Sequence, residues 1–301
     1  MTQRAARRER LDLLAIGLLI GCCALWGLNQ VAAKAALADV PPLTQAALRS
    51  TGAALLVLGW AKARGLTLFE RDATLRGGLV AGALFAGEFA CIFIGLQFTS
   101  ASRMVVFIYL APFVVALGMP LIARGERLGT LQWIGLAAAF AGVAWAFAEA
   151  LSPAAAAPPR QWLGDALGVA AAVLWGATTL AIRATPLSTA SAEKTLLYQL
   201  AVSGLLLSLA APLAGETWPL RWSALSLGSL AFQTVIVTFA SYLTWFWLMR
   251  HYPATRISAF VLLTPVFGLA AGVTLLGEPL TLRLVVALAA VVLGLALVNR
   301  A

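Results

Sequence analysis

A short motif occurs twice in this chain and constrains its architecture more than any other feature. Leu25-Trp26-Gly27 recurs as Leu174-Trp175-Gly176, and each copy lies in the first of five apolar segments of membrane length. A repeat with an odd number of spans places its second copy upside down, because the chain enters that copy from the opposite side of the membrane. The sequence therefore predicts two five-helix repeats of opposite orientation.

The composition places the chain in a membrane. Of its 301 residues, 61% are hydrophobic and 11% are charged, and the mean hydropathy is +0.91. A water-soluble fold would expose too much apolar surface, and about 20 apolar residues cross a bilayer. Ten such spans are expected, at residues 13–33, 43–61, 78–98, 104–123, 131–149, 164–182, 195–213, 224–248, 257–276 and 282–298. The predicted fold class is an all-α polytopic membrane protein whose ten transmembrane helices form two inverted five-helix repeats.

The boundary between the repeats is expected in a proline- and alanine-rich stretch. We predict a first repeat at residues 1–150, an external linker at 151–163 and a second, inverted repeat at 164–301. Alanine and proline runs are typical of connections between folded units. Positions also pair across the halves, since Pro112 in span four falls opposite Pro265 in span nine.

Basic residues indicate the orientation. With a cytoplasmic amino terminus, fifteen Lys and Arg fall on the inner side and five on the outer side. Among them, Lys34 at the outer end of span one corresponds to Arg183 at the inner end of span six. The bias predicts that both termini are cytoplasmic. The Arg-over-Lys, Ala-rich composition favours a bacterial source and hence the cell inner membrane. The net charge of +9 is scattered over short connections, so no nucleic-acid partner is expected.

Polar residues inside the spans mark a candidate pathway. An unpartnered polar side chain in lipid costs several kcal/mol, so it should face protein or water. Equivalent positions of spans one and six carry such residues beside each motif: Trp26, Asn29 and Gln30, and Trp175, Thr178 and Thr179. We expect both sets to bind substrate in a central cavity. The alternative is that they only bond neighbouring helices.

Span eight carries a second candidate surface. Thr234, Thr238, Ser241 and Trp245 follow the i, i+4, i+7, i+11 spacing of one α-helical face. We expect Thr238, Ser241, Tyr242 and Trp245 to contribute to substrate binding.

Tyr109 and two prolines complete the predicted pathway. Tyr109 lies about one turn before Pro112 and is expected to stack on a planar substrate, with plain packing as the alternative. Pro112 and Pro265 remove a backbone donor in mid-span and bend their helices. They are predicted hinges, or else prolines that only shape the bundle.

Two charged residues lie deep within spans, away from the span ends. Glu88 lies near the middle of span three, where a charge costs roughly 2.5 to 3.5 kcal/mol on insertion scales. Three roles stay open for it: an anchor for a substrate ammonium group, a proton-exchanging site, or a carboxyl that only holds helices together. Arg49, about two turns into span two, is expected to play a structural role, either snorkelling outward or reaching Glu88.

Small residues predict helix packing, and two acidic residues predict helix capping. Gly17 with Gly21, and Gly78 with Gly82, form small-xxx-small faces that let helices approach closely. Glu126 and Glu278 begin the turns before spans five and ten, where a carboxylate suits an adjacent helix amino terminus.

These features together resemble a known family. The paired Trp-Gly, the proline in the fourth span and the Gly-Glu turn before the fifth span, present as Gly125-Glu126 and Gly277-Glu278, are similar to the drug/metabolite transporter superfamily. The resemblance is closest to its ten-span bacterial metabolite exporters, which include the aromatic amino acid exporters, and it covers nearly the whole chain. It implies an inverted-repeat carrier with a central cavity that exports amino acids or related metabolites.

The predicted function is therefore a secondary membrane transporter that exports amino acids, aromatic or otherwise apolar, or related small metabolites by alternating access. Its expected partners are a small-molecule substrate and the lipid bilayer; uniport, proton antiport and the oligomeric state stay open. No cofactor or metal site is expected. The lone histidine, His251, lies in a basic connection without a catalytic partner motif, so an enzyme is not expected. A membrane-embedded lipid-processing enzyme or flippase is the alternative.

Overall fold

The computed structural model describes residues 12–70, 72–122, 129–150, 160–219, 221–252 and 260–298. All regular structure in these ranges is helical. The elements are α1 (Leu13–Ala36), α2 (Pro42–Ala63), α3 (Thr74–Gly95), α4 (Ala101–Ile108), α5 (Ala111–Ile122), α6 (Thr130–Ala150), α7 (Gln161–Ala184), the 3₁₀ turn η1 (Pro186–Thr189), α8 (Ala192–Leu213), α9 (Ala224–Ala231), the π-helix η2 (Phe232–Ser241), α10 (Tyr242–His251), α12 (Leu263–Leu276) and α13 (Leu282–Val298).

These elements form ten spans. α4 and α5 make one broken span, α9, η2 and α10 follow one another without interruption in another, and each remaining helix makes its own. Seven segments of the described chain are long and apolar enough to cross a membrane, and α12 and α13 are shorter apolar helices. The predicted all-α, ten-helix membrane fold is confirmed. Most of the expected linker, at residues 151–159, lies outside the described residues.

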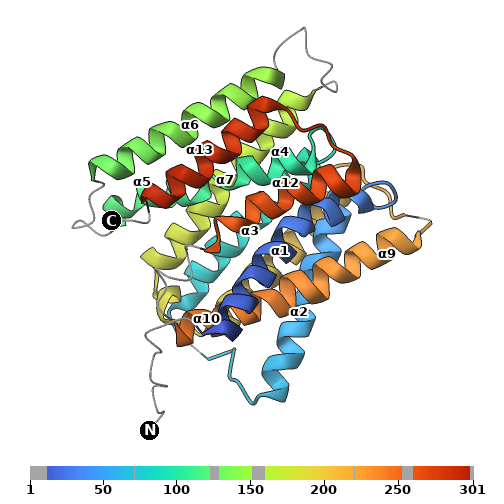
Figure 1. Ribbon diagram of the computed structural model, residues 1–301. Coiled ribbons are helices and arrows are strands. Elements are labelled where there is room, and N and C mark those ends of the chain that lie inside the picture. The colour runs from blue at the N-terminus through green and yellow to red at the C-terminus, as the bar shows by residue number, and fades with distance from the viewer. Residues whose placement is uncertain are drawn as a thin grey trace.

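Packing between the helices repeats when the two halves are exchanged. α6 lies beside α13 at one edge of the bundle (Figure 1), and α2 lies beside α8. The contact of α3 with α7 has its counterpart in the contact of α1 with α9 and η2. Likewise, α1 packs on α12 as α7 packs on α4 and α5. Two inverted copies that pack around a shared axis produce this arrangement.

The glycine of each motif makes a close contact between the halves. A Cβ on Gly27 would lie 2.5 Å from the backbone nitrogen of Gly268 in α12. A Cβ on Gly176 would lie 2.6 Å from the Cβ of Val114 in α5. Each motif glycine thus seats the first span of its repeat against the proline-bearing span of the other repeat. The repeated Trp-Gly pair therefore has a packing cause that does not depend on the substrate.

One predicted small-residue face is confirmed and the other is wrong. A Cβ on Gly78 would meet the Tyr198 ring at 2.4 Å, and one on Gly82 would meet the Cβ of Val202 at 2.5 Å, so α3 packs closely on α8. At Gly17 and Gly21 a Cβ would meet nothing within 4 Å. The spacing reports that two small residues share a face; it cannot report whether another helix covers that face.

Both candidate hinges lie just after a break in their span. α4 ends before Tyr109 and Leu110, and Pro112 is the second residue of α5. The amide of Leu110 donates to the carbonyl of Phe107 at 3.1 Å, which tightens the chain before the proline. Pro265 is the third residue of α12 and also follows a turn. That the two breaks move as hinges stays a prediction.

We expect Gly27→Ala to lower the free energy of unfolding by about 1–3 kcal/mol, because its Cβ would meet backbone atoms of α12, which cannot rotate away. Gly21→Ala on the same helix is the matched control and should be neutral. Thermal unfolding of both variants in detergent tests this. Equal midpoints for the two variants would contradict the packing role of the motif glycine.

Candidate functional site

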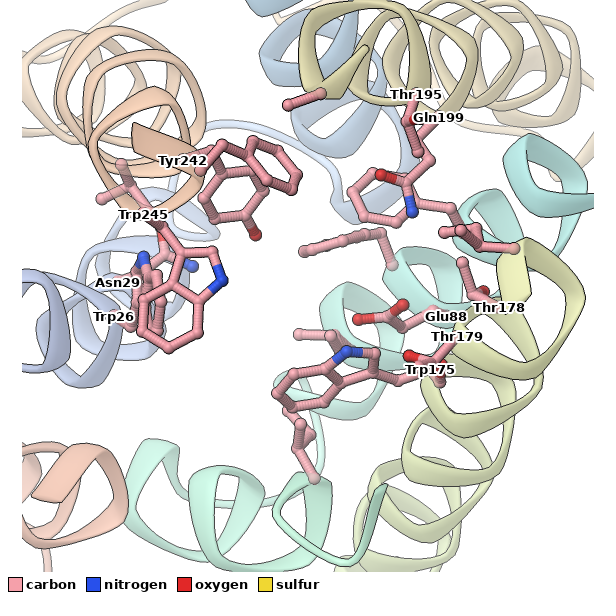
Figure 2. Close-up of a pocket in the computed structure, with 18 of the residues that line it drawn as sticks. Trp26, Asn29, Glu88, Trp175, Thr178, Thr179, Thr195, Gln199, Tyr242 and Trp245 are labelled. Carbon is pink, nitrogen blue, oxygen red and sulfur yellow. The ribbon is translucent and has the colours of Figure 1, made fainter. Parts of the chain in front are cut away.

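A cavity of about 750 Å³ lies in the middle of the bundle, between two facing groups of helices. Figure 2 shows Trp26 and Asn29 of α1 with Tyr242 and Trp245 of α10 on one wall, and Glu88 of α3 with Trp175, Thr178 and Thr179 of α7 on the other. The first wall joins spans one and eight, and the second joins spans three and six. These pairs are symmetry counterparts, so the cavity lies where the two repeats meet.

Most of the predicted substrate-binding residues line this cavity. They are Trp26, Asn29, Gln30, Glu88, Tyr109, Trp175, Thr178, Thr179, Tyr242 and Trp245. The two that do not are Thr238 and Ser241, which are buried in η2. Substrate binding by the lining residues stays a prediction.

The π-helix explains why the face predicted for span eight is wrong. Its backbone bonds run from i to i+5, so residues spaced for an α-helix no longer point the same way. Thr234 packs instead on Gly52 of α2, where a glycine Cβ would lie 2.9 Å from its methyl group. Downstream of η2, Tyr242 and Trp245 face the cavity.

Ser241 holds an aromatic group in place. Its Oγ accepts a hydrogen bond from the Trp26 indole nitrogen at 2.8 Å. The Trp26 ring also makes edge contacts with Tyr242, at 6.2 Å between centroids, and with Trp245, at 5.1 Å. These contacts lock α1 to η2 and α10, so this wall is one unit.

The opposite wall presents an aromatic pair and hydroxyl oxygens. Tyr109 meets Trp175 edge to face, with centroids 5.7 Å apart and planes at 88°. The hydroxyl of Thr178 donates to the carbonyl of Leu174 at 2.8 Å, and that of Thr179 donates to the carbonyl of Trp175 at 3.2 Å. Because the hydroxyl protons are used within α7, both threonines offer the cavity acceptors only.

Several polar atoms at the cavity have no hydrogen-bond partner in the described part of the chain. They are Asn29 Oδ1, Gln30 Oε1, Glu88 Oε2 and Thr264 Oγ1. Glu88 is 5% exposed, so its carboxyl is nearly shielded from water. Burying such groups is costly unless something bonds them, which a cation, a proton or ordered water would do. All three predicted roles of Glu88 stay open.

Neither of the two contacts expected for Arg49 is found, and its structural role stays a prediction. Its side chain is fully buried and does not reach outward, and the described residues contain no ion pair between Arg49 and Glu88. The guanidinium carbon lies 3.7 Å from the centroid of the Phe89 ring instead. The aromatic face balances part of the charge that an ion pair with Glu88 was expected to balance.

The sequence reasoning missed the contribution of α8. Thr195 and Gln199 line the cavity from this helix, and Figure 2 shows them on the same wall as Glu88. Their i, i+4 spacing inside an apolar span was the available signal. Arg183 and Ser188, from the end of α7 and from η1, also line it.

The cavity extends to the end of the bundle at which α1 begins, called here the proximal end. Its lining continues from mid-bundle to Arg183 and Ser188, which are exposed there. At the same end Lys194 pairs with Asp72 at 2.7 Å, tying α8 to the start of α3. Hydrogen bonds from Lys194 and Thr74 lower the pKa of Asp72 to about 2, so this carboxylate is ionised throughout the physiological range.

The opposite, distal end is closed by a buried ion-pair network. Arg103 of α4 bonds Asp165 of α7 at 2.6 Å and Glu149 of α6 at 2.9 Å. Thr99 also donates to Asp165, at 2.6 Å. Asp165 is fully buried and Arg103 is 5% exposed. Residues of both halves thus meet here with their charges satisfied. The sequence did not reveal this network, since its members lie far apart in the chain.

Two carboxylates also close the distal end by capping helices of the other half. Glu278 accepts from the backbone amides of Ala101 and Ser102 at 2.7 and 2.8 Å, so it caps a helix as predicted, although the helix is α4 and not the one that follows its own turn. Glu126, for which the same role was predicted, lies outside the described residues. Glu216 binds the start of α2 in the same way, through the amides of Leu43 and Thr44, both at 2.8 Å. The second cap was not predicted.

Ten spans in two inverted halves, with matched residues around a mid-bundle cavity, define a multi-pass membrane transporter. The chain belongs to the EamA-like transporter family, whose model matches residues 13–148 and 162–300. The resemblance to the drug/metabolite transporter superfamily is thereby confirmed at the level of the family.

Curated relatives and a solved structure agree with this assignment. The uncharacterized transporter YvbV of Bacillus subtilis is 28% identical over 278 residues, covering 91% of this chain and 88% of the relative. The uncharacterized transporter sll0355 of Synechocystis is 28% identical over 282 residues, covering 85% and 81%. A protein crystal structure at 24% identity matches with a TM-score of 0.64 over 93% of this chain and 95% of the other, which shows the fold.

We expect Trp175→Ala and Tyr109→Ala each to weaken transport about tenfold, because each removes half of an aromatic pair at the cavity. Transport kinetics in proteoliposomes measure the effect. Trp162→Ala, an exposed tryptophan at the start of α7, is the matched control and should leave transport unchanged. Unaltered kinetics in both cavity variants would remove these aromatics from the site.

Proposed function

We propose that the protein is a secondary transporter that exports amino acids, aromatic or otherwise apolar, or closely related metabolites, by alternating access. The observation that carries the proposal is the cavity: it is lined by matched residues of the two repeats, reaches the proximal end and is sealed at the distal end. We further propose a bacterial inner-membrane location with both termini in the cytoplasm. The proximal end is then cytoplasmic, and this conformation faces inward.

The lining supports an apolar substrate with few polar groups. Five aromatic side chains of the predicted set surround the space: Trp26, Tyr109, Trp175, Tyr242 and Trp245. Flat aromatic faces bind planar apolar groups and cations alike. The Glu88 carboxyl among them supplies one anionic group, which suits a substrate ammonium. The cavity therefore fits a small molecule with one apolar part and one amino group.

Two symmetry-related cations support the alternating-access part of the proposal. Lys34, at the end of α1, donates to the backbone carbonyls of Leu96, at 3.4 Å, and of Thr99. Its counterpart Arg183, at the end of α7, lines the exposed mouth of the cavity. We call these two cations the latches. The Lys34 latch is bonded and therefore closed, whereas the Arg183 latch is open. If the two repeats exchanged their conformations, the distal end of the cavity would open and the proximal end would close.

We expect Lys34→Met to raise the population of the outward-facing state about tenfold, because it removes charged hydrogen bonds that hold the distal end closed. The reporter is Asn29→Cys in a variant whose native cysteines are replaced by alanine. Its reaction rate with a membrane-impermeant thiol reagent applied from the distal side measures opening. Lys62→Met, at the exposed end of α2, is the control; equal rates in the two variants would contradict the latch.

Flux of radiolabelled amino acids into liposomes containing the purified protein tests the substrate assignment. We expect saturable flux of aromatic amino acids, reduced at least about tenfold by Glu88→Gln because a neutral amide cannot balance an ammonium charge. Glu70→Gln, an exposed carboxylate at the proximal end, should transport normally. Absence of flux for every amino acid would overturn the substrate class.

An imposed pH gradient separates the modes of transport. A wild-type response to the gradient that Glu88→Gln abolishes would assign proton exchange to this residue. Flux indifferent to the gradient would identify facilitated transport.

A further inference from the structure

Arg49 carries a charge that the proposed transport cycle does not yet use. Its side chain is fully buried in α2. None of its three guanidinium nitrogens, Nε, Nη1 and Nη2, has a hydrogen-bond partner in the described part of the chain. An arginine has five N–H donors in a planar fork, and none of the five donates a hydrogen bond to a described residue.

The aromatic contacts of Arg49 do not replace those hydrogen bonds. The guanidinium carbon lies 3.7 Å from the centroid of Phe89 and 5.8 Å from that of Phe93. Such contacts balance part of the charge through the ring faces, but they leave the N–H groups desolvated and unbonded. A buried cation without a hydrogen-bonded counterion binds an anion that reaches it.

Phe89 contacts Arg49 and also lines the cavity. Phe89 and its neighbour Glu88 both line the cavity, whereas Arg49 does not. One aromatic ring therefore separates an unpaired cation from a space that already contains an unpaired carboxyl.

We propose that Arg49 is the carboxylate-binding group of the cavity, and that the Phe89 ring covers it in this conformation. The guanidinium fork matches a carboxylate in a two-point contact, and Arg183, the arginine that lines the cavity, lies at its exposed mouth and not at mid-bundle. This assignment rests on the proposed function insofar as an amino acid would present its carboxylate to Arg49 while its ammonium faces Glu88.

Binding of radiolabelled benzoate to the purified protein in lipid nanodiscs tests the proposal, with benzyl alcohol as the uncharged analogue of the same shape. We expect wild-type protein to prefer benzoate about 10- to 100-fold, and Arg49→Gln to lose that preference while it keeps its affinity for benzyl alcohol. Arg49→Lys retains the charge without the fork and should keep only part of the preference. If Arg49→Gln does not fold, Arg49→Lys still decides, since an unchanged preference would overturn the two-point contact.

Removing the Phe89 ring should change the affinity for benzoate in the opposite direction. Phe89→Ala should strengthen benzoate binding, because the guanidinium then faces the cavity directly. Phe93→Ala removes a ring of the same size that also contacts Arg49 but does not line the cavity, so it controls for the lost packing and should not strengthen binding. Equal benzoate affinity in the two variants would contradict the covering role of Phe89.

The benzoate result is independent of the flux result. Arg49-dependent benzoate binding in a protein without amino acid flux would keep the carboxylate site and reject the amino acid. Amino acid flux with benzoate binding that ignores Arg49 would keep the proposed function and reject the site, leaving Arg49 as a packing residue.

Discussion

Hydrocarbon provides no hydrogen bonds, so every polar atom in a membrane span must find its partner inside the protein, and the rest of this structure depends on that constraint. At the distal end the requirement is met: Arg103 has Asp165 and Glu149, and Glu278 has backbone amides of α4. At mid-bundle it is not met, since Glu88 and Arg49 retain unbonded polar atoms in the described chain. The difference separates groups that hold the helices from groups left to bind something else.

The sequence is more symmetric than the structure. The motif glycines make equivalent contacts, and the tryptophans beside them face one cavity from opposite walls. The latches differ, because Lys34 is bonded to the α3–α4 connection while Arg183 lines the open mouth. We propose that the two copies, which have matching contacts but different latches, exchange between two equivalent arrangements of nearly equal energy. That property suits a carrier, which needs both arrangements to be populated.

Prediction from the sequence succeeded where a local pattern has one structural meaning. It failed where the helix type or the packing of other helices decides the environment of a residue. Residues beside the repeated motif line the cavity because their spacing on an α-helix fixes their direction. The prediction of one face on span eight was wrong because η2 is a π-helix, and no residue type in the sequence predicts a π-helix. Gly17 and Gly21 share a face that no helix covers, and Arg49 found Phe89 where Glu88 was expected.

The sequence by itself determined the class of the molecule, its ten spans, its inverted repeat and the polar and aromatic cavity residues near the repeated motif, since hydropathy and helical periodicity depend on neighbours along the chain. Only the tertiary structure decided which end of the cavity is sealed and which charged groups are paired within the protein. Arg103, Glu149 and Asp165 come from three separate helices, and Glu216 caps a helix that begins more than 170 residues earlier. Such pairings depend on distances in space, which the order of residues does not contain.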